Sequence, residues 1–388
     1  MSTFDPSDLV ALGAELSEEE RLVQRTARAF VHDRVLPQVG HWFEAGVFPR
    51  ELVRELGGLG FLGMQLEGYG CAGAGPVSYG LVCFELEAGD SGLRSFVSVQ
   101  GSLAMFALRE YGDEQQKQAY LPLMASGELV GCFGLSEADA GSDPASMRTR
   151  ARRDGGDWVL DGSKMWITNG SIADLAVVWA TTDEGIRGFL VPRGTPGFST
   201  VDIHRKWSLR ASVTSELVFD SCRLPADAQL PGATGLKAPL SCLDEGRYGI
   251  AWGALGAATS CYKSALDYSL QRKQFGRPIA SFQLTQAKLA DMAVELQKGL
   301  LLAYHMGRLK EAHRISAVQV SIGKLNNVRE ALEIAREART ILGAAGVTLE
   351  HPVMRHAANL ESVLTYEGTS EVHQLVIGRA LTGINAFD

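Results

Sequence analysis

The alternation of hydrophobic and polar positions predicts helices over the first third of the chain. Residues 17–20 (Ser-Glu-Glu-Glu) form a capping box that opens a helix running through Phe30. Residues 49–56 predict a second helix, which the pair Gly57-Gly58 ends. Residues 91–111 are largely apolar and long enough for a buried helix.

From about residue 130 the pattern changes to short β-type runs. Gly, Asp, Asn and Pro residues separate these runs, and the even spacing with turn signals predicts a compact β-barrel or sandwich. The runs cover residues 158–160, 164–168, 175–179, 188–191 and 215–219.

After the Pro-Gly pair at 231–232 the pattern becomes helical again to the end of the chain. Apolar residues keep helical spacing at Leu289, Met292, Leu296, Leu300 and Ala303. The order is therefore helices, strands, helices, which predicts an α+β protein and not an alternating βαβ fold. We expect an N-terminal helical domain over 1–130, a central β-barrel domain over 131–232 and a C-terminal helical bundle over 233–388.

Composition and charge narrow the class of protein. The chain has 388 residues, 46% hydrophobic and 21% charged, with a net charge of −8, so we expect no nucleic-acid partner. Six scattered cysteines without a Cys-x-x-Cys pair indicate reduced thiols of a cytoplasmic protein. The eight histidines lack metal-ligand spacing, and no metal site is expected.

Targeting signals are also absent from the pattern. Residues 1–8 are acidic and lack both an apolar core and an Arg-rich amphipathic pattern, which argues against secretion and organelle import. No apolar stretch approaches the roughly 20 residues of a membrane span. We therefore expect a cytoplasmic protein.

Two segments match the pattern G-x-G-x-x-G, at 58–63 and 68–73. A dinucleotide site needs a strand before this pattern and a helix after it. Here the first match follows a helix and the second lies in the next loop. They are interpreted as a helix stop and a tight loop.

The run Thr-Tyr-Glu-Gly-Thr-Ser-Glu at 365–371 holds the strongest chemical signal. It places the carboxylate of Glu367 between Tyr366 and Gly368, where it could be held against a flat substrate in a dry pocket. Desolvation would raise its proton affinity and make it a general base. The alternative for this run by itself is a charged surface turn.

Three other segments add weaker signals. Residues 132–143 begin as a strand and end in a turn of small residues, whose N–H groups could meet a phosphate or a ring carbonyl. Strand alternation puts Trp166 and Thr168 on one face. Arg272 and Gln283 lie before and at the start of a helix and could bind a pyrophosphate. Each alone is a weak signal, for which a structural role is the more common explanation.

Taken together and in this order, these segments resemble the acyl-CoA dehydrogenase family over essentially the whole chain. The resemblance implies bound FAD, an acyl-CoA substrate, a homotetramer of paired dimers, and electron transfer to an electron-transferring flavoprotein. Within the family, the sequence is most similar to members that act on glutaryl-CoA. The matching segments are 85–95, 98–100, 131–136, 247–253 and 378–384.

Physical chemistry supports a special role for Arg94. A dicarboxylate thioester has a distal anion that must be paired once it is desolvated, and an Arg contact is worth roughly 1.5–3 kcal/mol. The alternative is that Arg94 forms an ion pair with Glu87 or Asp90.

The resemblance also implies roles for individual residues, with Glu367 as the base that removes the α-proton. FAD contacts are implied for Phe133, Leu135, Ser136, Ser142, Trp166, Ile167, Thr168, Arg272, Phe275, Gln283, Thr340, Gly343 and Thr369, with Arg272 and Gln283 reaching a neighbouring subunit's cofactor. Substrate contacts are implied for Glu87, Arg94, Ser95, Ser98, Ser142, Asp244, Arg247, Tyr248, Tyr366 and Gly368.

The sequence departs from the family pattern at three places. Ser136 stands where Thr is usual, which keeps the hydroxyl. Residues 341–346 (Ile-Leu-Gly-Ala-Ala-Gly) replace a usual Leu-Gly-Gly-Asn-Gly, and Leu93 occupies a position that is often Tyr. The second departure bears on a contact to the neighbouring subunit's FAD, and the third on the acyl pocket.

The reaction implied is oxidative decarboxylation of glutaryl-CoA to crotonyl-CoA and CO2. One alternative is a short- or branched-chain acyl-CoA dehydrogenase in which Arg94 is structural. Others are a glutaryl-CoA dehydrogenase that does not decarboxylate and a catalytically silent FAD- or acyl-CoA-binding protein.

Overall fold

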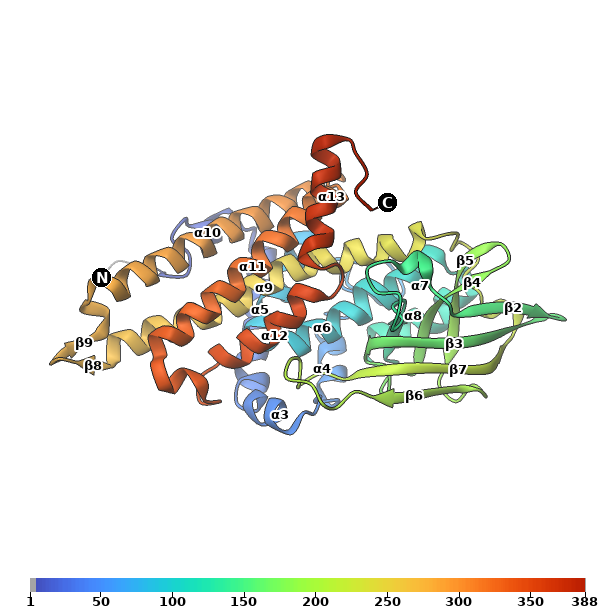
Figure 1. The fold of residues 1–388 in the computed structure, drawn as a ribbon, viewed down its shortest axis with the longest axis horizontal. Coiled ribbons are helices and arrows are strands. Elements are labelled where there is room, and N and C mark those ends of the chain that lie inside the picture. The colour runs from blue at the N-terminus through green and yellow to red at the C-terminus, as the bar shows by residue number, and fades with distance from the viewer. Residues whose placement is uncertain (1–4, 388) are drawn as a thin grey trace.

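Helices from both ends of the chain pack into one bundle, and the strands of the middle form a sheet at one end of the molecule (Figure 1). The computed structural model describes residues 5–387. Residues 1–4, part of the N-terminal segment interpreted above, lie outside that range. The predicted α+β class, with helical N- and C-terminal parts around a central β-region, is confirmed.

The N-terminal helices begin and end at local signals. The capping box is present as predicted, because the Ser17 side chain accepts from the Glu20 N–H and the Glu20 side chain accepts from the Ser17 N–H. The predicted buried helix over 91–111 is continuous but includes a π-helical stretch over Val99–Met105. The helices are α1 (Leu12–Glu15), α2 (Glu18–Phe30), α3 (Val39–Ala45), α4 (Leu52–Gly58), α5 (Pro76–Gly89), α6 (Ser91–Ser98), α7 (Phe106–Tyr111) and α8 (Glu114–Ala125).

The middle of the chain forms one seven-stranded sheet in the order β1-β4-β2-β3-β7-β6, with β5 paired to β4. Two predicted runs are a single strand, β3, in which a bulge lies between Lys164 and Ile167. The strands are β1 (Gly131–Gly134), β2 (Arg150–Asp154), β3 (Asp157–Thr168), β4 (Leu175–Thr182), β5 (Gly185–Pro192), β6 (Phe198–Asp202) and β7 (Thr214–Leu224).

The C-terminal part consists of long helices and one small hairpin. The predicted helical spacing over 289–303 lies in α10, where Met292, Leu296, Leu300 and Ala303 are buried. No helix within residues 5–387 is long and apolar enough to cross a membrane. The elements are α9 (Lys237–Gln271), β8 (Lys273–Gln274), β9 (Arg277–Pro278), α10 (Gln283–Glu311), α11 (Ala317–Leu342), α12 (Val353–Thr365) and α13 (Ser370–Thr382).

A stripe of glycines on α9 lets this helix approach α5 and the segments around it closely. Gly246, Gly249, Gly253 and Gly256 recur three or four residues apart and so share one face of the helix. A Cβ at Gly256 would lie 2.8 Å from the carbonyl carbon of Phe84 in α5, and one at Gly249 would lie 2.9 Å from the Tyr79 hydroxyl. Larger residues at these positions would force the helices apart.

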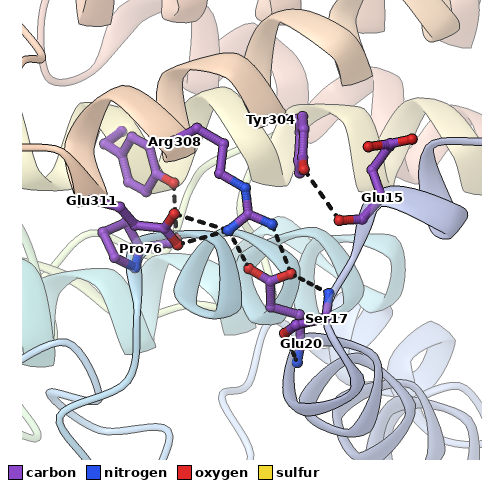
Figure 2. Close-up of polar contacts among 8 residues, drawn as sticks. Glu15, Ser17, Glu20, Pro76, Tyr304, Arg308 and Glu311 are labelled. Atoms are coloured by element: carbon purple, nitrogen blue, oxygen red, sulfur yellow. Dashed lines mark hydrogen bonds and ion pairs between the residues drawn. The ribbon is translucent and has the colours of Figure 1, made fainter.

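An ion pair between α2 and α10 joins the N-terminal helices to the C-terminal bundle. Figure 2 shows Arg308 of α10 facing Glu20 of α2, with Nη1–Oε1 and Nη2–Oε2 distances of 2.6 and 2.9 Å. The same Glu20 carboxylate closes the capping box, and Glu311 also contacts Arg308. This two-pronged contact fixes the start of α2 against α10.

Candidate active site

Glu367 lies in the short loop between α12 and α13. Its φ is +51° and that of Gly368 is +102°, so both residues adopt left-handed backbone conformations. Thr369 then caps α13 by accepting a hydrogen bond from the Val372 N–H at 3.3 Å. The loop therefore turns sharply and directs the Glu367 carboxylate inward.

The Glu367 carboxylate occupies space that a glycine of α9 leaves open. A Cβ at Gly246 would lie 2.9 Å from the Cδ of Glu367 and would overlap its Oε2. Oε2 is buried and has no hydrogen-bond partner within residues 5–387. A buried, unpaired carboxylate oxygen is available to accept a proton from a bound molecule.

Burial raises the pKa of Glu367, and this effect exceeds that of the three cations around it. Arg94, Lys324 and Arg247 lower the pKa, while the nearby Asp244 raises it further. The raised pKa gives this carboxylate a higher proton affinity than an exposed Glu. This is the electrostatic setting that a general base requires.

Arg94 of α6 is buried next to the Glu367 loop. Its Nε donates to Glu87 Oε2 of α5 at 2.6 Å, and the exposed fractions of the two residues are 1% and 0%. Its Nη2 donates to the hydroxyl of Tyr366, the residue before Glu367. Burial is the largest influence on the pKa of the guanidinium and lowers it, but the charge of Glu87, the Tyr366 hydroxyl and the hydrogen bond to Glu87 together outweigh burial, so the pKa is raised. Arg94 is therefore a cation in the interior.

The choice of Arg94's partner follows from the surroundings of Asp90. Asp90 Oδ1 accepts from the Gly92 N–H and caps α6, while Oδ2 accepts from Arg355 and Asn359 at 2.6 and 2.9 Å. The ion pair between Arg94 and Glu87 is therefore the contact that the structural alternative for Arg94 predicted, and Asp90 is not its partner. Ser95 also lies here, 3.2 Å from the Tyr366 hydroxyl, and Ser98 follows one helical turn after Arg94 with its hydroxyl buried.

The α9 side of the site carries Asp244 and Arg247. Arg247 donates from Nε to the Glu367 carbonyl at 2.7 Å and from Nη1 to Asp244 at 2.8 Å. Tyr248 is fully buried, and its hydroxyl donates to the Pro76 carbonyl at 2.8 Å. Arg247 thus holds the Glu367 loop directly, whereas the hydrogen bond of Tyr248 joins α9 to the start of α5.

The loop after β1 is held by a buried ion pair. Lys164 Nζ lies 2.7 Å from Glu137 Oε1, and Glu137 also accepts from the N–H groups of Arg148 and Thr149 at 2.7 and 2.9 Å. The Met165 N–H donates to the Ser136 carbonyl at 2.9 Å. These contacts fix Ser136 beside the end of β3, where Trp166 and Thr168 lie.

Trp166 is presented to solvent by the bulge in β3. Its φ is +65° and its exposed fraction is 63%, whereas the neighbouring Ile167 is buried. A left-handed conformation is rare for a bulky residue and is typical of functional sites. The exposed indole and the half-buried Thr168 therefore form a surface that suits a flat ring system.

Comparisons with known proteins agree with this arrangement. Residues 17–128, 132–222 and 233–382 match the N-terminal, middle and C-terminal domains of acyl-CoA dehydrogenases. The chain belongs to the acyl-CoA dehydrogenase family. The resemblance inferred from the sequence motifs is therefore confirmed.

Several members of this acyl-CoA dehydrogenase family are close relatives. Two crystal structures of glutaryl-CoA dehydrogenase from Mycobacterium smegmatis superimpose with a TM-score of 0.98. One is 64% identical and covers 99% of both chains, and the other, in complex with FADH2, is 61% identical and covers 100% of both. The human mitochondrial short-chain specific acyl-CoA dehydrogenase is 38% identical over 94% of this chain and 90% of its own length.

Apart from Thr369, which caps α13, the residues predicted to contact FAD fall into a group at the sheet and a group outside it. Phe133, Leu135, Ser136, Ser142, Trp166, Ile167 and Thr168 lie in and beside the sheet, and Phe133, Leu135 and Ile167 are buried. Arg272, Phe275 and Gln283 are exposed around the β8–β9 hairpin, at the opposite end of the molecule (Figure 1). Thr340 and Gly343 are exposed at the C-terminal end of α11. One chain does not bring the two groups together.

Sequence reasoning missed Lys324 and His373, which the structure places at Glu367, and it did not foresee the role of Gly246. Gly246 makes room for the carboxylate, and His373 of α13 is buried against Gly368. Lys324 of α11 is also buried and donates to the carbonyls of Tyr366 and Gly368. A signal for Lys324 was available, because it interrupts the buried apolar spacing of Val320 and Val328.

Proposed function

We propose that this chain is an FAD-dependent dehydrogenase that oxidises and decarboxylates glutaryl-CoA to crotonyl-CoA and CO2. The observation that carries the proposal is the buried guanidinium of Arg94 close to Glu367. Arg94 donates to Tyr366, the residue before Glu367, and the Oε2 atom of Glu367 has no hydrogen-bond partner within residues 5–387. A base and an interior cation so arranged suit a substrate with a thioester at one end and a carboxylate at the other. The close relatives named glutaryl-CoA dehydrogenase support the same substrate.

The residues of the chain fit FAD. Trp166 offers an exposed aromatic surface, and the hydroxyls of Ser136, which is bonded through its carbonyl to Met165, and of Thr168 would serve as hydrogen-bonding groups for a polar ring edge. Arg272 and Gln283 would hold the pyrophosphate and adenosine end of a cofactor bound to a neighbouring subunit. When bound, FAD supplies the two-electron acceptor of the oxidation.

Glu367 removes a proton from the carbon next to the thioester carbonyl. Its desolvated carboxylate takes that proton on Oε2, the oxygen that has no partner within residues 5–387. The left-handed backbone, and the absence of a side chain at Gly246 against which the carboxylate lies, hold this oxygen in one place. The base therefore acts without first losing a competing hydrogen bond.

Arg94 binds the distal carboxylate. Glu87 takes the Nε donor and Tyr366 takes one donor of Nη2, while Nη1 donates no hydrogen bond within residues 5–387. Nη1 is therefore available to the substrate. Because Glu87 shares the guanidinium, the substrate carboxylate is held less firmly than by a free arginine. A weaker hold favours its departure as CO2.

The proposal includes the assembly and the partner. A homotetramer of paired dimers would carry the exposed hairpin around Phe275, which is 93% exposed, to the cofactor of a neighbouring subunit. Electrons would pass to an electron-transferring flavoprotein, and the enzyme would act in the cytoplasm. Size-exclusion chromatography with light scattering tests the tetramer directly.

The decisive experiment adds glutaryl-CoA to the purified holoprotein without oxygen and follows flavin bleaching and CO2 release together. We expect both signals, and butyryl-CoA as the matched control should release no CO2. Preference for butyryl-CoA would instead favour a short- or branched-chain acyl-CoA dehydrogenase. Bleaching by glutaryl-CoA without CO2 would indicate a non-decarboxylating enzyme, and no bleaching by either substrate would contradict the dehydrogenase proposal.

A further inference from the structure

Three successive backbone carbonyls around Glu367 each accept a hydrogen bond from a basic side chain. Lys324 Nζ donates to the carbonyls of Tyr366 and Gly368, and Arg247 Nε donates to that of Glu367 at 2.7 Å. Lys324 comes from α11 and Arg247 from α9, so two helices hold the loop. Lys324 is 1% exposed, and its Nζ also lies over the Tyr366 ring, 5.8 Å from the centroid.

The Tyr366 carbonyl belongs to the same peptide group as the N–H of Glu367. Within residues 5–387 this N–H donates no hydrogen bond. A cation bound to the carbonyl end of a peptide draws electron density from the group and makes its N–H a stronger donor, as in any chain of hydrogen bonds. Lys324 is therefore placed to have two effects on this peptide group: it fixes the orientation of the group, and it polarises the N–H.

We propose that Lys324 is a positioning residue of the reaction, which orients and polarises the Glu367 N–H as the donor to the thioester carbonyl oxygen of the acyl-CoA. The inference rests on the proposed function, because it requires an acyl-CoA beside Glu367. As the α-proton moves to the Glu367 carboxylate, negative charge moves from that carboxylate to the thioester oxygen. A donor aimed in advance at the oxygen stabilises this charge where it develops.

The charges around Lys324 fit this role. Burial lowers the pKa of Lys324 to about 7; the Glu367 carboxylate acts in the opposite direction, whereas Arg247 and Arg94 lower the pKa further. Proton transfer neutralises Glu367 and leaves the new negative charge close by, so Lys324 keeps an anionic neighbour. The other titratable groups that face this loop are Glu87, Arg94, Asp244, Arg247, Tyr366 and His373.

The strained loop conformation gives Lys324 a second task. Glu367 adopts φ +51°, which a non-glycine residue keeps only when its surroundings determine it. Three cationic contacts to consecutive carbonyls provide that determination. A purely structural role for Lys324 is the alternative, and it predicts no change in how a bound thioester carbonyl is polarised.

The test measures the carbonyl itself. Crotonyl-CoA labelled with 13C at the thioester carbonyl is bound to the oxidised holoprotein, and its carbonyl stretch is recorded by difference infrared spectroscopy. We expect the parent protein to lower this frequency relative to free ligand, and Lys324→Met to lose most of that shift. Because the N–H remains, flavin bleaching by glutaryl-CoA should slow by about 10- to 100-fold, less than for complete loss of such a donor. Lys324→Arg, which keeps the charge, should recover part of the shift.

A matched control separates this effect from general damage to α11. Asn327 lies three residues further along, is buried, and donates to the carbonyls of Ala251 and Gly299, at 2.8 Å and 3.4 Å. Asn327→Ala therefore removes comparable contacts away from the Glu367 loop. We expect it to leave the carbonyl frequency of bound crotonyl-CoA unchanged.

The outcomes decide between the hypotheses. A full carbonyl shift in Lys324→Met would overturn the polarising role even if turnover were slow. Should Lys324→Met yield no holoprotein, Lys324→Gln and Lys324→Arg replace it, and failure of all three to fold would mean that Lys324 serves stability alone. A parent protein that does not bind crotonyl-CoA, or leaves its carbonyl unshifted, would instead count against the proposed function.

Discussion

Gly246→Ala is the smallest change that tests the placement of the base. The added Cβ would lie 2.9 Å from the Glu367 Cδ and would overlap Oε2. Non-bonded carbon atoms prefer about 3.5–4.0 Å, so the carboxylate must retreat by about 0.6–1 Å. Only the end of the Glu367 side chain has to move, whereas the backbone of α9 can stay in place.

The magnitude follows from that displacement. A misplacement of about 1 Å at a reacting group can cost about 100-fold in rate. Replacing a glycine inside a helix by alanine gains about 0.5–1 kcal/mol in helix propensity, which offsets part of the steric cost. We therefore expect flavin bleaching to slow by about 100-fold with both glutaryl-CoA and butyryl-CoA, at nearly unchanged stability.

Gly253→Ala, a second variant on the same face of α9, should behave differently. A Cβ at Gly253 would lie 3.1 Å from both Arg94 Nε and Glu87 Cδ. Gly253→Ala should therefore impair glutaryl-CoA more than butyryl-CoA, because it disturbs the cation and not the base. Gly378→Ala in α13, where an added Cβ meets nothing within 4 Å, is the neutral control.

The assay is stopped-flow measurement of anaerobic flavin bleaching, with thermal unfolding of each variant alongside. Bleaching by Gly246→Ala at close to the parent rate would refute the assigned position of the base. A large loss of stability in Gly246→Ala would show that the backbone had moved, and the local argument would then be wrong.

Three further predictions concern Glu367, Arg94 and His373. Glu367→Gln keeps the shape but removes the proton acceptor, so bleaching should slow by about 100- to 10,000-fold while acyl-CoA binding, followed by titration, survives. Arg94→Gln should lower kcat/KM for glutaryl-CoA by about 30- to several-thousand-fold, from a cost of about 2–5 kcal/mol. Butyryl-CoA should be little affected, and an equal loss with both substrates would make Arg94 structural. Burial lowers the pKa of His373 to about 3, below its usual value of about 6.5 in an unfolded chain. Between these two pKa values the unfolded state binds more protons than the folded state. The contribution of His373 to stability is therefore present above about pH 6.5 and is lost as the pH falls toward 3. His373→Gln should flatten the unfolding profile over that range, and an unchanged profile would exclude this residue.

The sequence predicted elements whose signals are local. The capping box over 17–20 and the apolar spacing of α10 involve residues within one or two helical turns, and both are confirmed. The strands β2 and β6 were missed for a physical reason. The segment Arg150–Asp154 carries four charged residues among five, and Phe198–Asp202 at the sheet edge keeps no fully buried position. β2 and β6 are strands because they pair with β3 and β7, and the hydrophobic pattern of each segment alone does not predict that pairing.

The bulge in β3 shows the same limit at the site. Alternation alone places Trp166 and Thr168 on one face, but it would also place Lys164 there. The extra residue between Lys164 and Ile167 lets Lys164 turn inward to Glu137 while Trp166 remains exposed. Register against β7 decided this detail.

Motifs in the sequence alone determined the family, the helix–strand–helix order and the choice of Glu367 as the candidate base, because each lies within a short, continuous segment. Tertiary structure alone decided which groups surround that base. Glu87 became the partner of Arg94 because Arg355 and Asn359, more than 260 residues away, already occupy Asp90. Lys324 reaches the loop from 43 residues upstream because α11 packs beneath it. Such contacts depend on how helices distant in sequence pack together, and no local pattern encodes that geometry.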